Sequence, residues 1–280
     1  MIRQQSFRNQ MPTLYLVATP IGNLGDMTYR AVDILNMVDT IFCEDTRTSI
    51  VLLRHYNIQK PLLSYHDHNK EFASSQILSR LEHRENVALI SDAGMPLISD
   101  PGYVVVQQAI AAGYNVVSIP GASASLTALS VSGLAPHPFL FYGFLDAKKT
   151  KRENQLKELK EFPYTILFYE SPHRIHKTIL SMVDVLGERP LVLARELTKQ
   201  YEEIIRGTTT SLVDVPDIKG EMVLILGGYE PQPPVDTTTV LEAVERLITA
   251  GVSPKDAIKQ VAKERQLPKN DVYMTYHQSK

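Results

Sequence analysis

A short apolar strand followed by a loop rich in aspartate, glycine and proline is the feature that most restricts how this chain can fold. Val87–Ile90 is a continuous apolar run, which is typical of a strand covered on both faces of a parallel sheet. The loop SDAGMPLISDPG follows it directly. Within this loop, Asp100 and Pro101 predict the N-cap and the first position of a helix that runs through Tyr103 to Ala112.

This loop predicts a ligand site, because open α/β sheets bind ligands at the carboxyl ends of their strands. The alternative is a tight strand-to-helix turn that needs glycine and proline only for its shape. A plain turn rarely concentrates so many special residues, so the sequence favours the ligand site.

The same order of strand, loop and helix recurs five times between Leu14 and Gly133. Strands are predicted at residues 14–19, 40–45, 61–65, 87–90 and 115–119. The loops after the first, fourth and fifth strands contain GNLGD, SDAGMPLISD and PGASAS. Gly22 and Gly25 fit neither the dinucleotide fingerprint nor a P-loop, so the first loop predicts backbone contact with a ligand rather than a pyrophosphate site. Residues 12–135 are therefore predicted to form an α/β domain with a parallel sheet.

The pattern changes beyond Pro136 and Pro138, where strands outnumber helices. Residues 136–229 are predicted to form a second α/β domain with a mixed sheet, in which strands at 203–207 and 221–228 pair. Residues 230–238 read as a proline-rich linker. Residues 239–280 predict a small helical tail in the style of a helix-turn-helix unit, with a local excess of positive charge that suits RNA or subunit binding.

The composition is that of an ordinary soluble protein. The 280 residues carry a net charge of −2, so any contact with nucleic acid must come from local patches. The single cysteine, Cys43, excludes an intramolecular disulfide and fits a reducing cytoplasm.

No apolar run approaches the roughly 18 residues of a membrane span. Residues 1–11 predict a disordered extension without a signal peptide. No metal site is predicted, because His66 and His68 lack further ligands nearby.

Six motifs carry a resemblance to a known family. They are LYLVATPIGNLGD, CEDTR, SDAGMPLISDPG, IPGASA, FYESPHR and LARELTK, in that order. Over residues 14–228 the chain resembles the ribosomal small-subunit RNA 2′-O-methyltransferase I family of the tetrapyrrole methylase superfamily. The resemblance implies two α/β domains with S-adenosylmethionine in the cleft between them, and a homodimer. It also implies methyl transfer to the ribose 2′-hydroxyl of a cytidine in the decoding region of 16S rRNA, either in free RNA or in the small ribosomal subunit.

The resemblance also implies which residues bind the cofactor. They belong to the three loops named above and to two strand ends of the second domain: Gly22, Leu24, Gly25, Asp26, Asp92, Gly94, Met95, Pro96, Ser123, Ala124, Tyr169 and Glu221. For Asp26 and Ser123, helix capping is the alternative. Two departures lie in these loops, since the family pattern has a small residue in place of Met95 and a proline in place of Ala122.

The reaction needs an aligned hydroxyl and a group that takes its proton. The predicted base is Glu170 or Glu196, and the predicted clamp for a phosphate or carboxylate is Arg174 or Arg195. A structural ion pair is the alternative for each of them. A basic cluster of Lys148, Lys149, Lys151 and Arg152 predicts RNA contacts, with a solvated helix face as the alternative.

Two other functions remain open at this point. The same fold and cofactor serve enzymes that methylate a ring carbon of a tetrapyrrole, but a small ring needs neither the basic cluster nor the basic tail. A non-catalytic RNA-binding or ribosome-assembly factor would need no cofactor loops. The sequence therefore favours RNA ribose methylation.

Overall fold

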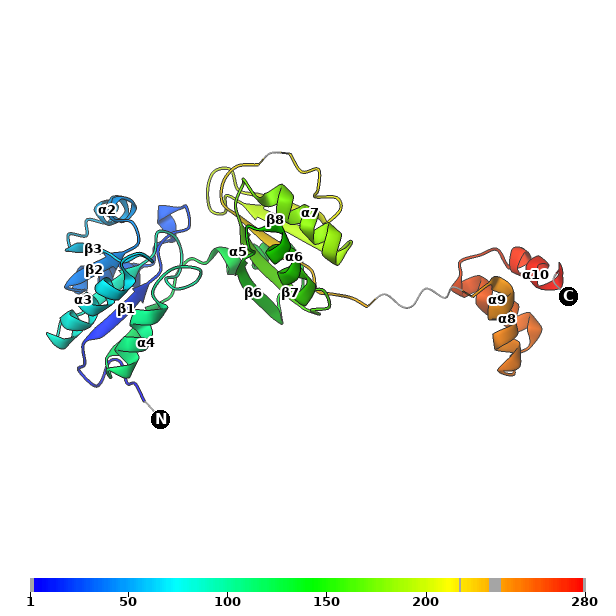
Figure 1. Ribbon diagram of the computed structural model, residues 1–280, viewed down its shortest axis with the longest axis horizontal. Helices are drawn as coiled ribbons and strands as arrows, with labels where there is room; N and C mark the ends of the chain where they lie inside the picture. Colours follow the sequence, from blue (N-terminus) through cyan, green and yellow to red (C-terminus); the bar gives the residue numbers. More distant parts are fainter. Residues whose placement is uncertain (1–2, 217, 232–237, 279–280) are drawn as a thin grey trace. The chain divides into compact units, whose positions relative to one another are not determined.

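In the computed structural model, residues 3–216, 218–231 and 238–278 are described, and they divide into two units, residues 1–229 and 230–280 (Figure 1). The first unit contains two separate sheets, and the second contains helices only. The predicted fold class, a parallel-sheet domain followed by a mixed-sheet domain and a helical tail, is confirmed. Among the described residues, no helix combines the length and the apolar character of a membrane span.

The first sheet is parallel and has the strand order β3-β2-β4-β1-β5. Its strands are β1 (Thr13–Val17), β2 (Thr40–Cys43), β3 (Leu62–Ser64), β4 (Val87–Ile90) and β5 (Asn115–Ile119). Helices α1 (Tyr29–Met37) and α2 (Thr46–His55) cover one face, and α3 (Lys70–Glu82) and α4 (Tyr103–Ala111) cover the other. Alternation along β1 explains both layers, because Leu14 packs with α3 and α4 while Val17 packs with α1 and α2.

The strand order creates a crevice at the carboxyl ends of β1 and β4. From β1 the chain moves to β2, towards one edge of the sheet, whereas from β4 it moves to β5 at the opposite edge. The loops that follow these two neighbouring strands therefore separate onto opposite faces. Ligands bind in open α/β sheets at such a switch point.

The second sheet is mixed, with the order β6-β7-β10-β8-β9. Its strands are β6 (Phe139–Phe144), β7 (Thr165–Glu170), β8 (Pro190–Arg195), β9 (Glu203–Thr208) and β10 (Met222–Leu226). The predicted pairing of β9 with β10 is wrong, since β10 lies between β7 and β8. All five residues of β10 are buried, so it takes a central position, whereas β9 is partly exposed and forms an edge.

Helices cover both faces of this second sheet. On one face lie α6 (Lys149–Glu158) and α7 (Ile175–Leu186). On the other lies α5 (Ala124–Ser132), whose Ala128 and Leu129 pack against β7, β8 and β10 (Figure 1). The predicted boundary at residue 135 placed α5 in the first domain, but its packing assigns it to the second. The segment between β5 and α5 consequently crosses from one sheet to the other.

The N-terminal residues have defined contacts, so the prediction of a disordered extension is corrected for residues 3–11. The side-chain amide of Gln4 donates to Val116 O at 2.9 Å and accepts from Val116 N at 3.1 Å. The Asn115 side chain donates to Ser6 O at 3.1 Å. β5 is an edge strand, and Gln4 satisfies backbone groups that a neighbouring strand would otherwise satisfy.

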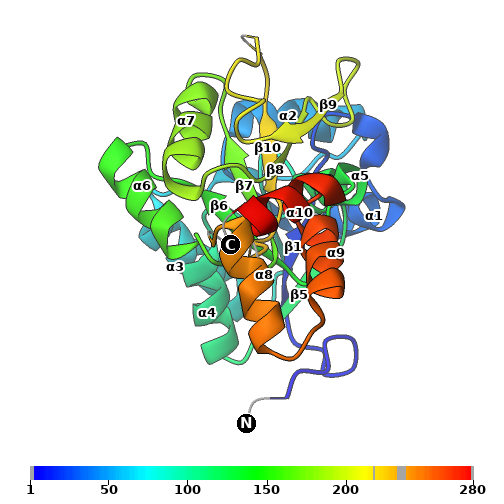
Figure 2. The same ribbon diagram turned by 90° about the vertical axis from the view of Figure 1, so that its right-hand side faces the viewer.

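The C-terminal unit is a bundle of three short helices (Figure 2). They are α8 (Val240–Thr249), α9 (Pro254–Glu264) and α10 (Lys269–Gln278), as the sequence predicted. A capping box between Thr239 and Glu242 starts α8, and Ser253 caps α9 ahead of a proline at its first position. The three helices share one core that includes Val244, Ile258 and Tyr276. Residues 232–237 of the predicted linker lie outside the described residues.

Candidate functional site

Two loops of the first sheet are tied together at the switch point. Thr19 N donates to Gly94 O at 2.9 Å, and Gly94 N donates to Thr19 O at 3.0 Å. The Ser91 hydroxyl donates to Gly94 O at 3.0 Å, and the Thr19 hydroxyl donates to Ser91 O at 3.1 Å. Gly94 has a φ of +81°, which favours glycine at this turn. These bonds fix the loop after β4 against the loop after β1.

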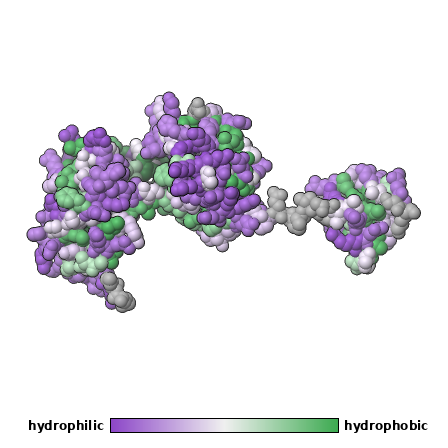
Figure 3. Space-filling model, in the orientation of Figure 1, coloured by the Kyte–Doolittle hydropathy of each residue, from purple (hydrophilic) through white to green (hydrophobic). Residues whose placement is uncertain are grey.

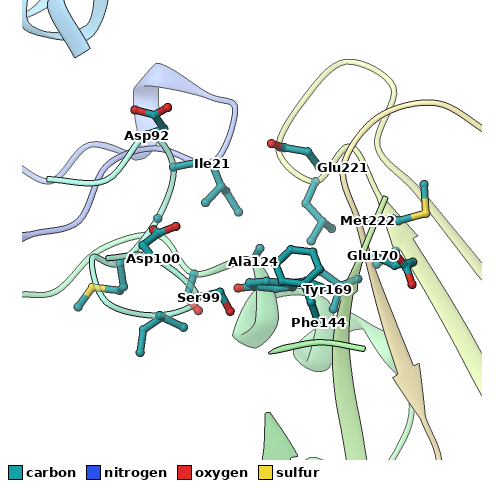
Figure 4. Close-up of a pocket in the computed structure, with 18 residues that line it drawn as sticks. Ile21, Asp92, Ser99, Asp100, Ala124, Phe144, Tyr169, Glu170, Glu221 and Met222 are labelled. Atoms are coloured by element: carbon teal, nitrogen blue, oxygen red, sulfur yellow. The ribbon is translucent and has the colours of Figure 1, made fainter. Parts of the chain in front are cut away.

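A pocket of about 260 Å³ opens beside these loops, and both sheets contribute to its walls (Figure 4). The loop after β4 supplies most residues of one wall, and the start of α5 supplies Ser123 and Ala124. The ends of β6 and β7 and the start of β10 supply Phe144, Tyr169 and Glu221 on the other side. The pocket therefore lies where the chain crosses between the sheets, and small changes in their relative position would alter it.

Asp100 lies in the loop predicted as a ligand site and lines this pocket, although the sequence assigned its own side chain to a helix cap. Helix α4 begins at Tyr103, and its N-cap is Gly102 with a φ of +140°. The prediction was wrong because Gly102 turns the chain after Pro101, which leaves the carboxylate of Asp100 facing the pocket (Figure 4). Burial, with a smaller contribution from the Glu44 carboxylate, raises the pKa of Asp100 to about 6.

Further carboxylates gather at the same end of the first sheet. Asp92 lines the pocket and accepts a hydrogen bond from Asp45 N at 3.2 Å. Burial raises the pKa of Asp92 from its ordinary value, and burial likewise raises the pKa of Glu44. Arg47, which donates to the Asp45 carboxylate, lowers the pKa of Asp45 to about 2. This end of the sheet is consequently acidic and suits a cationic ligand.

The loops on both sides of the site hold strained backbone. Leu97 and Ser99, in the loop after β4, have φ values of +73° and +67°. Glu196 and Thr198, in the loop after β8, have φ values of +49° and +67°. Residues other than glycine adopt a positive φ at a cost of roughly 1–3 kcal/mol each, and such strain clusters at binding sites. The surrounding contacts therefore hold these two loops in specific shapes.

Glu170 lies at the end of β7 in a buried network. Its carboxylate accepts from the Thr178 hydroxyl at 2.5 Å and from Ser171 N at 2.9 Å. The Arg174 Nε atom lies 3.3 Å from a carboxylate oxygen, which is a charge contact without hydrogen-bond geometry. The Arg174 guanidinium also donates to Leu145 O. Both Glu170 oxygens are thus already engaged, although the residue borders the pocket.

The other two predicted catalytic residues do not line the pocket. Arg195 lies 2.6 Å from the Glu203 carboxylate and donates to Lys219 O at 3.2 Å. Glu196 pairs with Lys199, with 3.0 Å between Nζ and Oε1. These contacts favour the structural ion pairs that were the alternative for both residues.

Comparison with known proteins decides the family. The family model described as Tetrapyrrole (Corrin/Porphyrin) Methylases matches residues 13–213. The chain belongs to the tetrapyrrole methylase family. It is 46% identical to "Ribosomal RNA small subunit methyltransferase I" of Bacillus subtilis (strain 168), over 98% of each chain. It is 47% identical to the protein of that name from Halalkalibacterium halodurans, over 98% of this chain and 99% of the relative. These matches place it in the methyltransferase I branch of the family.

Two solved structures of other proteins share the fold. The uroporphyrin-III-C-methyltransferase of Thermus thermophilus aligns with a TM-score of 0.54 at 17% identity, over 77% of this chain and 94% of that chain. A diphthine synthase aligns with a TM-score of 0.60 at 11% identity, over 77% of this chain and 89% of that chain. At such low identity these similarities establish the architecture alone.

The pocket of this methylase brings together part of the predicted cofactor set. The residues that line it are Asp92, Gly94, Met95, Ser123, Ala124, Tyr169 and Glu221. The residues of the set that do not line it are Gly22, Leu24, Gly25, Asp26 and Pro96. Ser123 precedes α5 without a capping hydrogen bond, and Thr28 rather than Asp26 caps α1. Helix capping therefore explains neither Asp26 nor Ser123.

The basic cluster lies at the start of α6, over which hydrophilic residues gather (Figure 3). Lys148, Lys149 and Lys151 are exposed, and the last two make only long ion pairs of 3.4–3.9 Å. Arg152 must be removed from the cluster because it is 3% exposed. Its guanidinium donates to the Ser181 hydroxyl at 3.0 Å and to Ala147 O at 3.1 Å, so it joins α6 to α7 and is not available to RNA.

Proposed function

We propose that this methyltransferase uses S-adenosylmethionine to methylate the ribose 2′-hydroxyl of a cytidine in the decoding region of 16S rRNA. The observation that carries the proposal is the match, over almost the whole chain, to relatives named ribosomal RNA small subunit methyltransferase I. The substrate is 16S rRNA or the small ribosomal subunit. The proposal places the protein in the cytoplasm as a homodimer. The C-terminal unit, in which residues 251–280 have six Lys or Arg and three Asp or Glu, aids contact with the RNA.

The chemistry of the pocket fits S-adenosylmethionine. Asp92 offers negative charge for a sulfonium or ammonium group of such a ligand. Ser99 and Ser123 offer hydroxyls at the wall. The apolar lining suits an adenine ring, and it consists of Ile21, Met95, Ile98, Leu197 and Met222 among others. Met95, one of the two departures from the family pattern, also lines the pocket, which supports a role for it in ligand binding.

When bound, S-adenosylmethionine supplies an electrophilic methyl group. The chain must then hold the ribose hydroxyl in line and accept its proton. Asp100 is the group best suited to this, because it borders the pocket and its pKa of about 6 leaves it largely ionised at neutral pH while still able to take a proton. Glu170 is less suited, since donors already engage both of its oxygens. We assign Glu170 and Arg174 to positioning the end of β7 and the chain after β6.

Nucleoside analysis of rRNA tests the function. In a strain that lacks this gene, mass spectrometry of 16S rRNA nucleosides is expected to show the loss of one 2′-O-methylcytidine, and the intact gene should restore it. Purified protein should transfer a labelled methyl group from S-adenosylmethionine to small subunits of the deletion strain. Unchanged 2′-O-methylcytidine in the deletion strain would contradict the proposal. A change in a tetrapyrrole instead would favour the alternative acceptor.

Asp92→Ala is expected to weaken the binding of S-adenosylmethionine by about 1 kcal/mol, or roughly fivefold, because it removes a carboxylate from the pocket wall. The effect is modest because the residue remains largely exposed and its carboxylate is only partly desolvated. Isothermal titration calorimetry measures it directly. Asp67→Ala is the matched control, since Asp67 also follows a strand of the first sheet but does not line the pocket. An equal affinity of the Asp92 variant and the wild type would remove Asp92 from the site.

Replacing Lys148, Lys149 and Lys151 by alanine is expected to lower affinity for the small subunit and to flatten its salt dependence. Each lost phosphate contact reduces the slope of log affinity against log salt by roughly 0.7 to 0.9. Binding titrations at several salt concentrations give the slope, and calorimetry should show unchanged cofactor affinity. Lys157→Ala in the last turn of α6 serves as the control. An unaltered slope in the triple variant would move the RNA site to the C-terminal unit.

A further inference from the structure

Phe144 is an exposed aromatic residue at the wall of the pocket. It is the last residue of β6, and 51% of its surface is exposed. Its ring lies edge-on against Tyr169, with 5.6 Å between the centroids (Figure 4). Leu145, the next residue, is 2% exposed and belongs to the core of the second sheet. The ring of Phe144 is therefore exposed at the pocket, whereas the next side chain in the sequence is buried in the core.

A bulge in β6 gives Phe144 this direction. Phe141 is in register with Leu167, and Phe144 with Tyr169, so Tyr142 is an extra residue in the strand. In a regular strand, residues 141 and 144 would point to opposite faces. The bulge, with Gly143 at a φ of +83°, brings both onto the face of Tyr169. Bulges beside sites often redirect a side chain in this way.

The bulge also brings β6 close to the other wall of the pocket. A side chain at position 143 would start 3.3 Å from the Ser99 hydroxyl, which is tighter than ordinary contact. Ser99 lies in the strained loop after β4 and lines the pocket. Because glycine has no side chain, β6 can approach this loop closely at position 143. The Phe144 ring therefore lies next to the loop that carries Asp100.

Exposed lysines follow Phe144 along the chain, outside the pocket. Arg174 donates to the carbonyl oxygen of Leu145, directly after Phe144. Lys148 and Lys149 follow at the start of α6, and both are exposed. Both walls of the pocket itself carry carboxylates, Asp92 and Asp100 on one side and Glu170 and Glu221 on the other, and these repel phosphates. An RNA strand would thus keep its phosphates outside the pocket, over the lysines that follow the exposed ring.

We propose that Phe144 is the platform on which the base of the target nucleotide stacks. The inference rests on the proposed RNA methylation. A nucleotide must leave its own stack to bring its ribose into an enclosed site, and it loses base stacking when it does so. An exposed aromatic face replaces that stacking for any base, whatever its hydrogen-bonding pattern. Phe144 is thereby a positioning residue for the base, while the ribose hydroxyl reaches the pocket.

Steady-state kinetics on small subunits from the deletion strain test this proposal. Phe144→Ala is expected to lower kcat/KM for the subunit by roughly ten- to a hundredfold, the loss that removing one stacked base causes. Phe144→Leu should lose nearly as much, because it keeps apolar bulk without an aromatic face. Phe144→Tyr should retain activity within a few-fold. Phe139→Ala is the matched control, since Phe139 is an exposed phenylalanine of the same strand that does not line the pocket.

The affinity for S-adenosylmethionine, measured by calorimetry, distinguishes base stacking from a role in cofactor binding and from a loss of folding. It should remain within about twofold in all four variants, which also reports that each variant is folded. A loss of cofactor affinity in Phe144→Ala, matching its loss of activity, would make the ring part of the cofactor wall and overturn the proposal. Full activity of Phe144→Leu would overturn it too. If the wild type itself fails to methylate the subunits, the proposed function fails, whereas full activity of Phe144→Ala refutes the stacking role alone.

Discussion

Asp100→Asn is expected to lower the rate of methyl transfer at pH 7 by roughly 10²- to 10⁴-fold, the usual contribution of a general base. The substitution keeps the size of the side chain and removes its ability to take a proton. At saturating S-adenosylmethionine and subunit, the loss should remain in kcat. If the activity of the variant instead recovers fully at high cofactor concentration, Asp100 binds the cofactor and is not the base.

The pH profile gives a second measurement of the same residue. The pKa of Asp100 is about 6, so the wild-type rate should rise with pH up to that value and level off above it. The profile of Asp100→Asn should lack this rise. Asp67→Asn is the control, because Asp67 does not line the pocket and should keep the wild-type profile. A wild-type rate that does not change between pH 5 and pH 7 would exclude Asp100 as the base.

Protein stability should fall with rising pH over the range in which the reaction rate rises. The folded-state pKa of Asp100 is raised from 3.8 to about 6, so between these values the folded state binds more protons than the unfolded state. The free energy of unfolding therefore falls as pH rises through this range. Asp100→Asn removes the buried charge and should stabilise the protein at pH 7 by on the order of 1 kcal/mol, a value reduced by solvent screening of this partly exposed group. The gain should vanish near pH 4.

Glu170→Ala is expected to destabilise the first unit by about 2–4 kcal/mol. The substitution leaves the buried hydroxyl of Thr178 without its acceptor and removes the negative charge beside Arg174. Glu170→Gln should lose less, because its amide oxygen can still accept one of these hydrogen bonds. Urea unfolding measures the change as a lower midpoint at an unchanged slope.

A surface ion pair of the same sheet provides the comparison. Glu203 lies 2.6 Å from Arg195, and its side chain is 47% exposed. Glu203→Ala should therefore cost no more than about 1 kcal/mol. Equal midpoints for the Glu170 and Glu203 alanine variants would mean that the buried network adds nothing beyond an exposed pair.

The sequence predicted the strands of the first sheet and the positions of the loops that follow them because both depend on local patterns. Continuous apolar runs such as Val87–Ile90 indicate buried parallel strands wherever they occur. The order of strands in a sheet depends on pairing between distant segments, and this is why the position of β10 was not predicted. The strand whose residues are all buried takes a central position in the sheet, and β10 is such a strand, whereas β9 is partly exposed. This difference can be judged only by comparing all the strands of the sheet with one another.

The errors at the site have equally local causes. Asp100 before Pro101 matches a helix start, but Gly102 bends the chain before the helix begins. Arg152 belongs to a run of basic residues, yet it shares a helical face with the buried Leu156 and Leu159. That spacing is visible in the sequence and could have identified Arg152 as buried. The bulge that directs Phe144 has no such signal apart from Gly143, whose effect depends on the register with β7.

The crossing of the chain before α5 determines where this protein can be divided. A fragment that ends at residue 135 would carry α5 without the sheet that buries Ala128 and Leu129, and would leave one face of the other fragment's sheet bare. A break between β5 and α5 keeps the two cores of the first sheet whole, since neither includes α5, and of the buried residues in the core that α5 forms with the second sheet it separates only Ile21. Split-protein reporters and circular permutants of this enzyme should therefore be divided at residues 120–123, and chimeras should be joined there. Such a break also falls at the pocket, so reassembly would restore the pocket only when the two pieces dock correctly.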